Sequence, residues 1–196
     1  MVETITPVVH GGRKKKYWTS VALHALGTTL AAATFGLVLG GIGALLRAPW
    51  GRIGAVVVAV VATMYAVREA LGLRIPLPER HKQVPQWWRD FFSAPVSSFL
   101  YGAGLGVGFF TFLKFGTYVA VAGVAFLSGD PMIGVLICLP FGLTRGLTVV
   151  LTARATEPED AGSLVDILDG WGSTRWPRLV NALALGCVAA AALWTL

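Results

Sequence analysis

Residues 19–46 read TSVALHALGTTLAAATFGLVLGGIGALL, a run without a single Asp, Glu, Lys or Arg. About 20 apolar residues are enough for an α-helix to cross the hydrocarbon core of a bilayer. A basic run, Arg13-Lys14-Lys15-Lys16, precedes this stretch. The apolar part is nevertheless much longer than the roughly 7 to 15 residues of a cleavable signal peptide. The stretch therefore predicts a retained transmembrane helix.

The composition of the whole chain agrees with this prediction. Of its 196 residues, 55 % are hydrophobic and only 13 % are charged, whereas about 25 % charged residues are usual in soluble domains. Backbone groups in hydrocarbon must form hydrogen bonds with each other, and long uninterrupted apolar segments do so as helices. The predicted fold class is therefore all-α, a polytopic integral membrane protein with about five transmembrane helices. Their expected ranges are 19–46, 53–73, 96–127, 132–153 and 179–196.

These helices are expected to form a single transmembrane domain over residues 19–196. A basic N-terminal segment, residues 1–18, precedes it. The outside connections are short and rich in turn residues. The two longer connections, 74–95 and 154–178, are expected in the cytoplasm.

The orientation follows from the distribution of lysine and arginine, which accumulate in cytoplasmic segments. With a cytoplasmic N-terminus, the outside loops hold only Arg47 and Arg52. The inside segments then hold Arg13, Lys14, Lys15, Lys16, Arg68, Arg74, Arg80, Lys82, Arg89, Arg154, Arg175 and Arg178. The prediction is a multi-pass protein of the cell (inner) membrane with its C-terminus outside. The net charge of +6 is then an orientation signal, and nucleic acid is not an expected partner.

Two cations, Lys114 and Arg145, fall within the predicted third and fourth helices. A cation in hydrocarbon costs from about 2.5 kcal/mol upward, so such residues usually face a protein interior or a water-filled path. Glu69 lies at the inner end of the second helix and Asp130 in an outer turn, so neither is placed to neutralise them. We therefore predict an anion-accepting site near the bilayer midplane.

The other predicted substrate-binding residues lie next to these cations or within about one helical turn of them. They are Thr111, Thr117, Tyr118, Thr144 and Thr148. Pro140 removes a backbone hydrogen bond and is expected, with nearby glycines, to interrupt the fourth helix, as in many transporter sites. In the alternative interpretation, both cations extend to the headgroups. Glycines at four-residue spacing, such as Gly36 and Gly40, then only allow helices to pack closely.

The remaining polar candidates are few. His24 is either a proton relay or an interfacial hydrogen-bonding residue. No His, Cys, Asp and Glu cluster has metal-ligand spacing, and no nucleotide-binding or nucleophile motif occurs. The sequence therefore indicates no enzyme, no metal and no cofactor.

The order of elements resembles the transmembrane cytochrome c biogenesis and thiol-disulfide interchange family, CcdA and the membrane domain of DsbD. The motifs that carry it are Ile53-Gly54, Gly102-x-Gly104-x-Gly106, Gly129-Asp130-Pro131 and Gly134-x-Leu136-x-x-Leu139. They lie within Leu26–Leu73 and Tyr101–Leu151. The resemblance extends to the TauE/SafE and LysE-type exporters. It implies six helices in two inverted halves, of which this chain would lack the first helix.

One departure concerns the thiols. Members that carry electrons use a cysteine in each half, whereas the corresponding residues here are Thr111-Phe112-Leu113-Lys114. The chain has two cysteines, Cys138 and Cys187, and a thiol relay requires two sulfurs that can reach each other. These two are either such a redox pair or small packing residues.

Three classes of function follow. The first is a small transporter or exporter of an anionic solute that uses the intramembrane cations. The second is a cysteine-poor CcdA/DsbD-like accessory protein for redox or cytochrome assembly, and the third is a structural subunit of a membrane complex. Expected partners are the lipid bilayer, a small anionic solute, and either further copies of the chain or another membrane protein.

Overall fold

The computed structural model describes residues 5, 7, 13–48, 51–77, 87–108, 116–154, 163, 166–167, 170–172 and 174–194. All regular structure in these residues is helical, which confirms the all-α prediction. Four helical stretches are long and apolar enough to cross a membrane. They are α1 (Lys14–Leu45), α2 (Arg52–Leu71), Pro131–Ala153, and α8 (Arg175–Trp194).

The third of these stretches consists of α6 (Pro131–Leu147) and the 3₁₀ segment Thr148–Arg154. Three shorter helices are also present: α3 (Trp88–Phe91), α4 (Ala94–Gly106) and α5 (Thr117–Leu127). Residues 163, 166–167 and 170–172 are helical as well.

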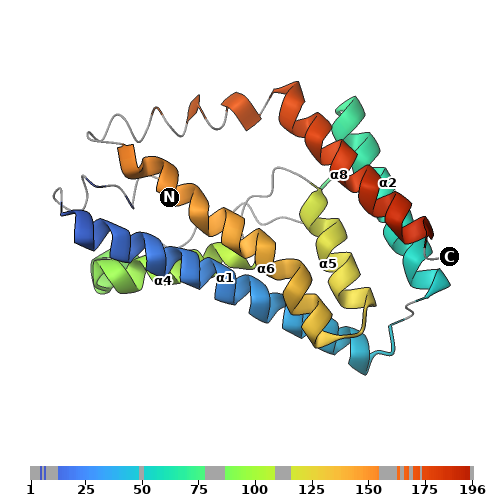
Figure 1. Cartoon of the computed structure of the whole chain (residues 1–196), viewed down its shortest axis with the longest axis horizontal. Helices are drawn as coiled ribbons and strands as arrows, with labels where there is room; N and C mark the ends of the chain where they lie inside the picture. Colours follow the sequence, from blue (N-terminus) through green and yellow to red (C-terminus); the bar gives the residue numbers. More distant parts are fainter. Residues whose placement is uncertain are drawn as a thin grey trace.

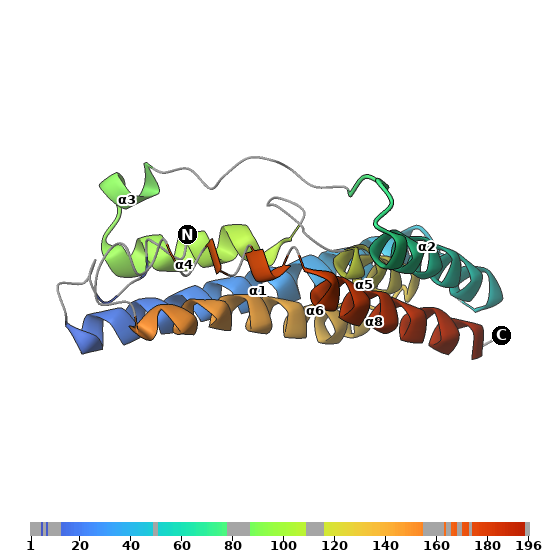
Figure 2. The ribbon, with the colours of Figure 1, turned by 90° about the horizontal axis from the view of Figure 1, so that it is seen from above.

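The helices form two groups joined by α5 (Figure 1). In the first group, α1 packs against α6 and α4. In the second group, α2 and α8 pack against each other. Helix α5 lies between the groups and contacts α1, α6, α2 and α8. Figure 2 shows that α3 and α4 lie on one side of α1 and α6.

Helix α1 begins at Lys14, inside the basic run that was predicted to precede it. Lysine is a good helix former, and the first turns are held by packing. Tyr17 and Val21 are buried together with Ile5 and Val149. The hydroxyl of Thr152 also donates to the Ile5 carbonyl oxygen at 2.7 Å. At about 1.5 Å per residue, the 32 residues of α1 extend well beyond a hydrocarbon core of about 30 Å.

Small residues bring α1 and α6 into backbone contact. A Cβ built on Gly36 would overlap the carbonyl oxygen of Gly134, and a Cβ on Gly134 would overlap that of Gly36. Similarly, a Cβ on Gly40 would overlap the carbonyl oxygen of Asp130. The interpretation that Gly36 and Gly40 serve close packing is therefore confirmed, as expected for small residues spaced four apart in membrane helices.

The predicted single helix over 96–127 is wrong, because the structure has two helices in this range. Helix α4 ends at Gly106, and α5 begins at Thr117. Gly108 has a φ of 73°, in the left-handed region that favours glycine. A Cβ there would overlap the ring of Tyr118. The apolar composition of this range did not predict the end of α4, because composition does not indicate the backbone conformation of a single glycine.

The predicted interruption at Pro140 is also wrong, since α6 continues through it to Leu147. Asp130 begins this helix as its N-cap, accepting hydrogen bonds from the amides of Met132 at 2.7 Å and Ile133 at 3.3 Å. Pro140 lies on an exposed face of α6, whereas Cys138 and Gly142 are buried. Removing one backbone hydrogen bond does not end a membrane helix when packing holds both of its sides.

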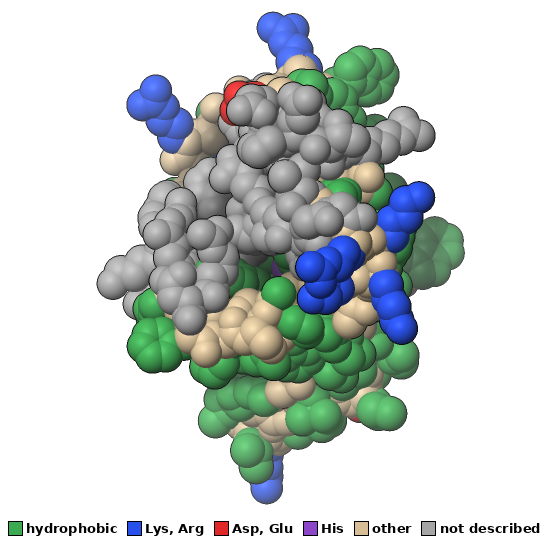
Figure 3. Space-filling view, turned by 90° about the vertical axis from the view of Figure 1, so that its left-hand side faces the viewer, with side chains coloured by type: hydrophobic (Ala, Val, Ile, Leu, Met, Phe, Trp, Pro, Cys, Tyr) green, Lys and Arg blue, Asp and Glu red, His purple; other side chains and the backbone are tan. Residues whose placement is uncertain are grey.

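Large apolar side chains cover the outside of the protein. Leu71, Leu136, Leu183 and Trp194 are 67 to 92 % exposed. In Figure 3, hydrophobic side chains cover much of the lower part of the face shown. Contiguous apolar surfaces of this extent are rare in soluble monomers. The four long helices are therefore compatible with a membrane.

Candidate functional site

The described residues of the predicted anion site come from two parts of the fold. Thr117 and Tyr118 begin α5, whereas Thr144, Arg145 and Thr148 lie on or directly after α6. Lys114 and Thr111 lie outside the described residues. The assumed common face around Lys114 required one continuous helix over 96–127, which the structure does not have.

The structure brings Arg145 and Tyr118 into contact with the same aromatic ring, that of Phe141. The guanidinium carbon of Arg145 lies 5.5 Å from the centroid of the Phe141 ring, a cation–π distance. The Phe141 ring stacks on Tyr118 with centroids 3.9 Å apart. The Tyr118 hydroxyl donates to the Val107 carbonyl oxygen at 2.9 Å. This arrangement ties α6 to α5 and to the end of α4, so its clearest role is structural.

Thr144 and Thr148 form hydrogen bonds with their own helix. The hydroxyl of Thr144 donates to the carbonyl oxygen of Pro140 at 2.9 Å, and that of Thr148 to the carbonyl oxygen of Arg145 at 2.7 Å. Both residues are exposed. Threonines commonly form such bonds in membrane helices. These two hydroxyls therefore need no bound solute as a partner.

Thr117 joins α5 to α8. Its hydroxyl donates to the side-chain carbonyl oxygen of Asn181, whose amide donates to the Pro177 carbonyl oxygen at 2.9 Å. Thr117 thus contacts the α2–α8 group, while the next residue, Tyr118, contacts the α1–α6 group. Neighbouring residues on a helix point in directions about 100° apart, which allows α5 to connect the two groups.

Sequence reasoning missed the buried carboxylate of Glu69. This residue is 4 % exposed, and its carboxylate pairs with the guanidinium of Arg68. The same carboxylate accepts a hydrogen bond from the Gly116 backbone amide at 3.2 Å, directly before α5. Arg68 also donates through Nε to the Ile75 carbonyl oxygen at 2.8 Å. Glu69 therefore connects the end of α2 to the start of α5.

A cavity of about 300 Å³ lies beside this pair. Arg68, Arg74, Arg178 and Glu69 line it, together with Leu73 and two glycines. The sequence analysis had already placed these three arginines on the cytoplasmic side, as part of the orientation signal. Their convergence could not be seen, since it requires the start of α8 to pack against the end of α2.

His24, the predicted proton relay, is 1 % exposed between α1 and α4. Its Nδ1 lies 3.2 Å from the Ser98 carbonyl oxygen, and Nδ1–H donates there. Its Nε2 is buried and has no hydrogen-bond partner among the described residues. Next to it, a Cβ on Gly102 would overlap the His24 carbonyl oxygen. The relay stays a prediction, and the geometry supports a hydrogen bond between two closely packed helices.

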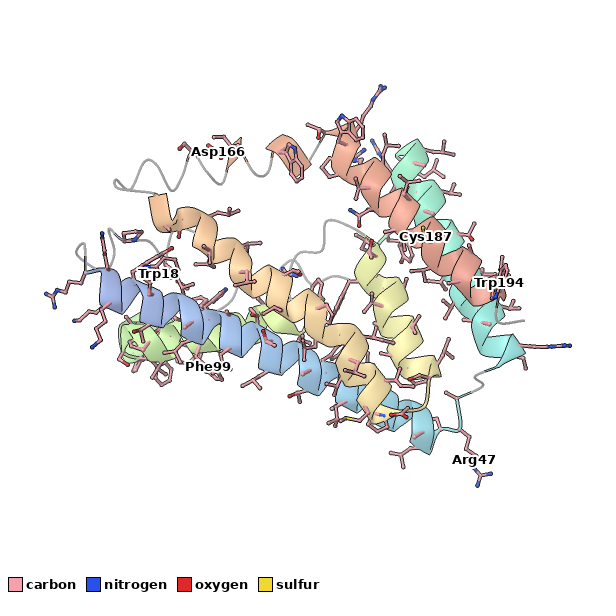
Figure 4. All side chains as sticks on the ribbon, in the orientation of Figure 1. Trp18, Arg47, Phe99, Asp166, Cys187 and Trp194 are labelled. Atoms are coloured by element: carbon pink, nitrogen blue, oxygen red, sulfur yellow. The ribbon has the colours of Figure 1, made fainter. Side chains whose placement is uncertain are left out.

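The two cysteines lie on different helices, and both are free thiols. Cys138 is completely buried on α6, and its Cβ lies against Gly36 of α1. Cys187 is exposed on α8, on the side of the molecule where α2 lies (Figure 4). Cys138 thus serves the packing of α1 on α6. In the part of the chain that the structure describes, no three His, Cys, Asp or Glu residues are grouped as a metal site would require.

The fold therefore defines an all-helical protein whose long apolar helices suit a membrane, with a buried ion pair and an arginine-lined cavity at one end of α2. The chain is similar to curated proteins named methylamine utilization protein MauF. It is 35 % identical over 129 residues to the protein of Methylophilus methylotrophus, a match that covers 65 % of this chain and 45 % of the relative.

Two further relatives of the same name come from Paracoccus. Identity is 31 % over 153 residues to the Paracoccus versutus protein, covering 76 % of this chain and 56 % of the relative. Identity to the Paracoccus denitrificans protein is 29 % over 154 residues, a match that covers 78 % of this chain and 56 % of the relative. The chain thus spans about half the length of the curated relatives it matches. No family model matches the chain, and no solved structure matches it.

These relatives overturn the resemblance inferred from the order of elements. They are named MauF, not CcdA, DsbD, TauE/SafE or LysE. The predicted anion carrier and the predicted CcdA/DsbD-like redox accessory protein are therefore wrong. The resemblance rested mostly on small and apolar residues, which any closely packed pair of membrane helices requires. Gly36 and Gly134 show this directly, because they are needed for the contact between α1 and α6.

Proposed function

We propose that this protein is a membrane-embedded accessory component of methylamine utilization that acts through contacts with partner proteins. The observation that carries the proposal is its similarity to MauF proteins over 129 to 154 residues. In this proposal the protein is not an enzyme. It lies in the bacterial inner membrane with a cytoplasmic N-terminus, an orientation supported by the unequal distribution of lysine and arginine.

The geometry supports a structural role over a solute path. Polar groups between the helices are engaged with the protein itself: Tyr118 with the end of α4, Thr117 with α8, and Glu69 with Arg68 and Gly116. Such contacts hold helices in a defined arrangement. The exposed apolar faces leave room for lipid and for a membrane partner.

The proposal predicts that deleting the gene abolishes growth on methylamine as the sole nitrogen source. Growth on ammonium should continue at the wild-type rate, because only methylamine utilization depends on the protein. The measurement is the growth rate of the deletion strain on each nitrogen source, with and without a plasmid copy of the gene. Unchanged growth on methylamine would rule out the proposed function.

A variant without thiols makes the test sharper. A plasmid copy carrying Cys138→Ala and Cys187→Ala should restore growth on methylamine as well as the wild-type gene does. Cys138 is a small packing residue, for which alanine is a close substitute, and Cys187 is exposed. If the double variant accumulates in the membrane but fails to restore growth, the protein acts through its thiols and the proposed role is incorrect.

A further inference from the structure

The cavity at the shared end of α2 and α8 carries an excess of positive charge. Three arginines and one glutamate line it, a formal balance of +2. Glu69 already accepts from Gly116 and pairs with Arg68. In the part of the chain that is described, Arg74 and Arg178 have no carboxylate partner.

The shape of the cavity depends on Gly72 and Arg178. Gly72 ends α2 with a φ of 68°, which turns the chain away from the helix axis. A Cβ on Gly72 would lie 3.7 Å from Nη1 of Arg178, so this guanidinium reaches from the first turn of α8 back to the end of α2. Leu73 and Arg74 follow Gly72 directly, and the cavity opens beside them.

The position of the cavity indicates which anion it would meet. It lies where two candidate membrane spans end, since α2 ends at Leu71 and α8 begins at Arg175. Residues within two positions of those that line it are large, apolar and exposed: Leu71 is 70 % exposed, Trp176 73 % and Leu179 44 %. Tryptophan side chains favour the interface between membrane and water. A polar cavity next to exposed apolar side chains at the ends of two candidate spans suits a ligand with a charged head and hydrocarbon tails.

We propose that this cavity binds the phosphate group of an anionic phospholipid, whose acyl chains lie along Leu71 and Leu179. Guanidinium groups hold phosphate through paired, charge-assisted hydrogen bonds. Basic pockets between helices on the cytoplasmic side are characteristic of sites for anionic headgroups. Arg74 and Arg178 make these bonds, and Arg68 is held in place by Glu69 and the Ile75 carbonyl oxygen. The site binds lipid whether or not the protein serves methylamine utilization.

The experiment is a lipid titration of the purified, delipidated full chain, followed by native mass spectrometry. The probes are dioleoyl phosphatidylglycerol and dioleoyl phosphatidylcholine in a neutral detergent. Phosphatidylglycerol should bind at least about tenfold more tightly than phosphatidylcholine, and Arg74→Gln with Arg178→Gln should remove this preference. Both arginines are exposed, so the double variant should keep its helix content and its elution volume.

A second double variant controls for overall charge. Arg47→Gln with Arg52→Gln also removes two positive charges, but at the opposite end of α2. Arg47 points away from the helices in Figure 4. This double variant should leave the preference for phosphatidylglycerol unchanged. Equal binding of both lipids, or an equal loss in both double variants, would overturn the proposal.

A competition experiment with inorganic phosphate distinguishes a site for a lipid phosphate group from a site for free phosphate. At millimolar concentration inorganic phosphate should not displace phosphatidylglycerol, because free phosphate lacks the acyl chains that contact the exposed apolar side chains. If phosphate displaces the lipid completely at this concentration, the cavity is a site for a free anion and the lipid assignment is wrong. The conservative change Arg178→Lys keeps the charge but removes the paired hydrogen bonds. It should weaken lipid binding by a smaller factor than Arg178→Gln.

Discussion

Replacing Gly36 with alanine should destabilise the protein by about 3 kcal/mol, the upper part of the usual range for overpacking. The added methyl group would overlap the Gly134 carbonyl oxygen, which belongs to helix backbone and cannot rotate away. Helices α1 and α6, which pack against each other, would have to separate. In a protein of this size the loss corresponds to a fall of roughly 6 to 12 °C in the apparent Tm. The measurement is the fraction of protein in detergent that stays folded after heating to a series of temperatures, determined by size-exclusion chromatography.

Gly41 supplies a matched control on the same helix. A Cβ on Gly41 meets no atom within 4 Å, while one on its neighbour Gly40 would overlap the Asp130 carbonyl oxygen. Alanine is favoured over glycine in a helix by up to about 1 kcal/mol. Gly41→Ala should therefore leave the apparent Tm unchanged or raise it, and Gly40→Ala should lower it. Equal Tm values for the Gly36, Gly40 and Gly41 variants would show that α1 and α6 do not pack through these glycines.

Replacing Glu69 with alanine should cost about 3 kcal/mol, as for breaking a buried ion pair by removing one partner. The change leaves the guanidinium of Arg68, which is 20 % exposed, without its carboxylate. It also leaves the Gly116 amide before α5 without an acceptor. The expected result is a lower apparent Tm. Faster amide hydrogen exchange is expected in the first turn of α5, while the middle of α1 exchanges as before.

Two further variants test how Glu69 acts. Glu69→Gln keeps an oxygen that can accept from the Gly116 amide, so it should lose less stability than the alanine variant. Asp166→Asn removes an exposed carboxylate (Figure 4) and should change the apparent Tm by no more than about 1 °C, because surface substitutions change stability little. If Glu69→Ala is as stable as the wild type, the connection between α2 and α5 contributes nothing to the fold.

Much of the helical architecture could be predicted from the sequence. The uncharged run over 19–46 became α1, and the ranges 53–73 and 132–153 differ from α2 and the Pro131–Ala153 stretch by at most two residues at either end. The last range, 179–196, began four residues too late, because α8 includes Arg175 and Trp176. Hydropathy averages over about 20 residues, so it locates long apolar helices well and their polar ends poorly.

The candidate site was less predictable. The sequence placed a charged pair of residues at the end of a span, but it did not show that Glu69 contacts Gly116, which lies 47 positions further along the chain. It also did not show that Arg74 and Arg178 share a cavity. Thr144 and Thr148 looked available to a solute, yet their hydroxyls bond to their own helix. Such partners depend on side-chain direction and on neighbouring helices, which spacing along one segment does not specify.

The sequence by itself determined that this protein is built from apolar helices. Hydrophobicity is a property of each residue and adds along a segment, so a window of 20 residues is sufficient to recognise a span. The tertiary structure alone decided where the helix after Ser93 ends, that α6 passes through Pro140, and which carboxylate meets which arginine. These outcomes depend on contacts between residues far apart in the chain. Some positions accept only glycine because a Cβ would overlap the backbone of another helix. Elsewhere, a backbone amide meets a carboxylate from a distant helix.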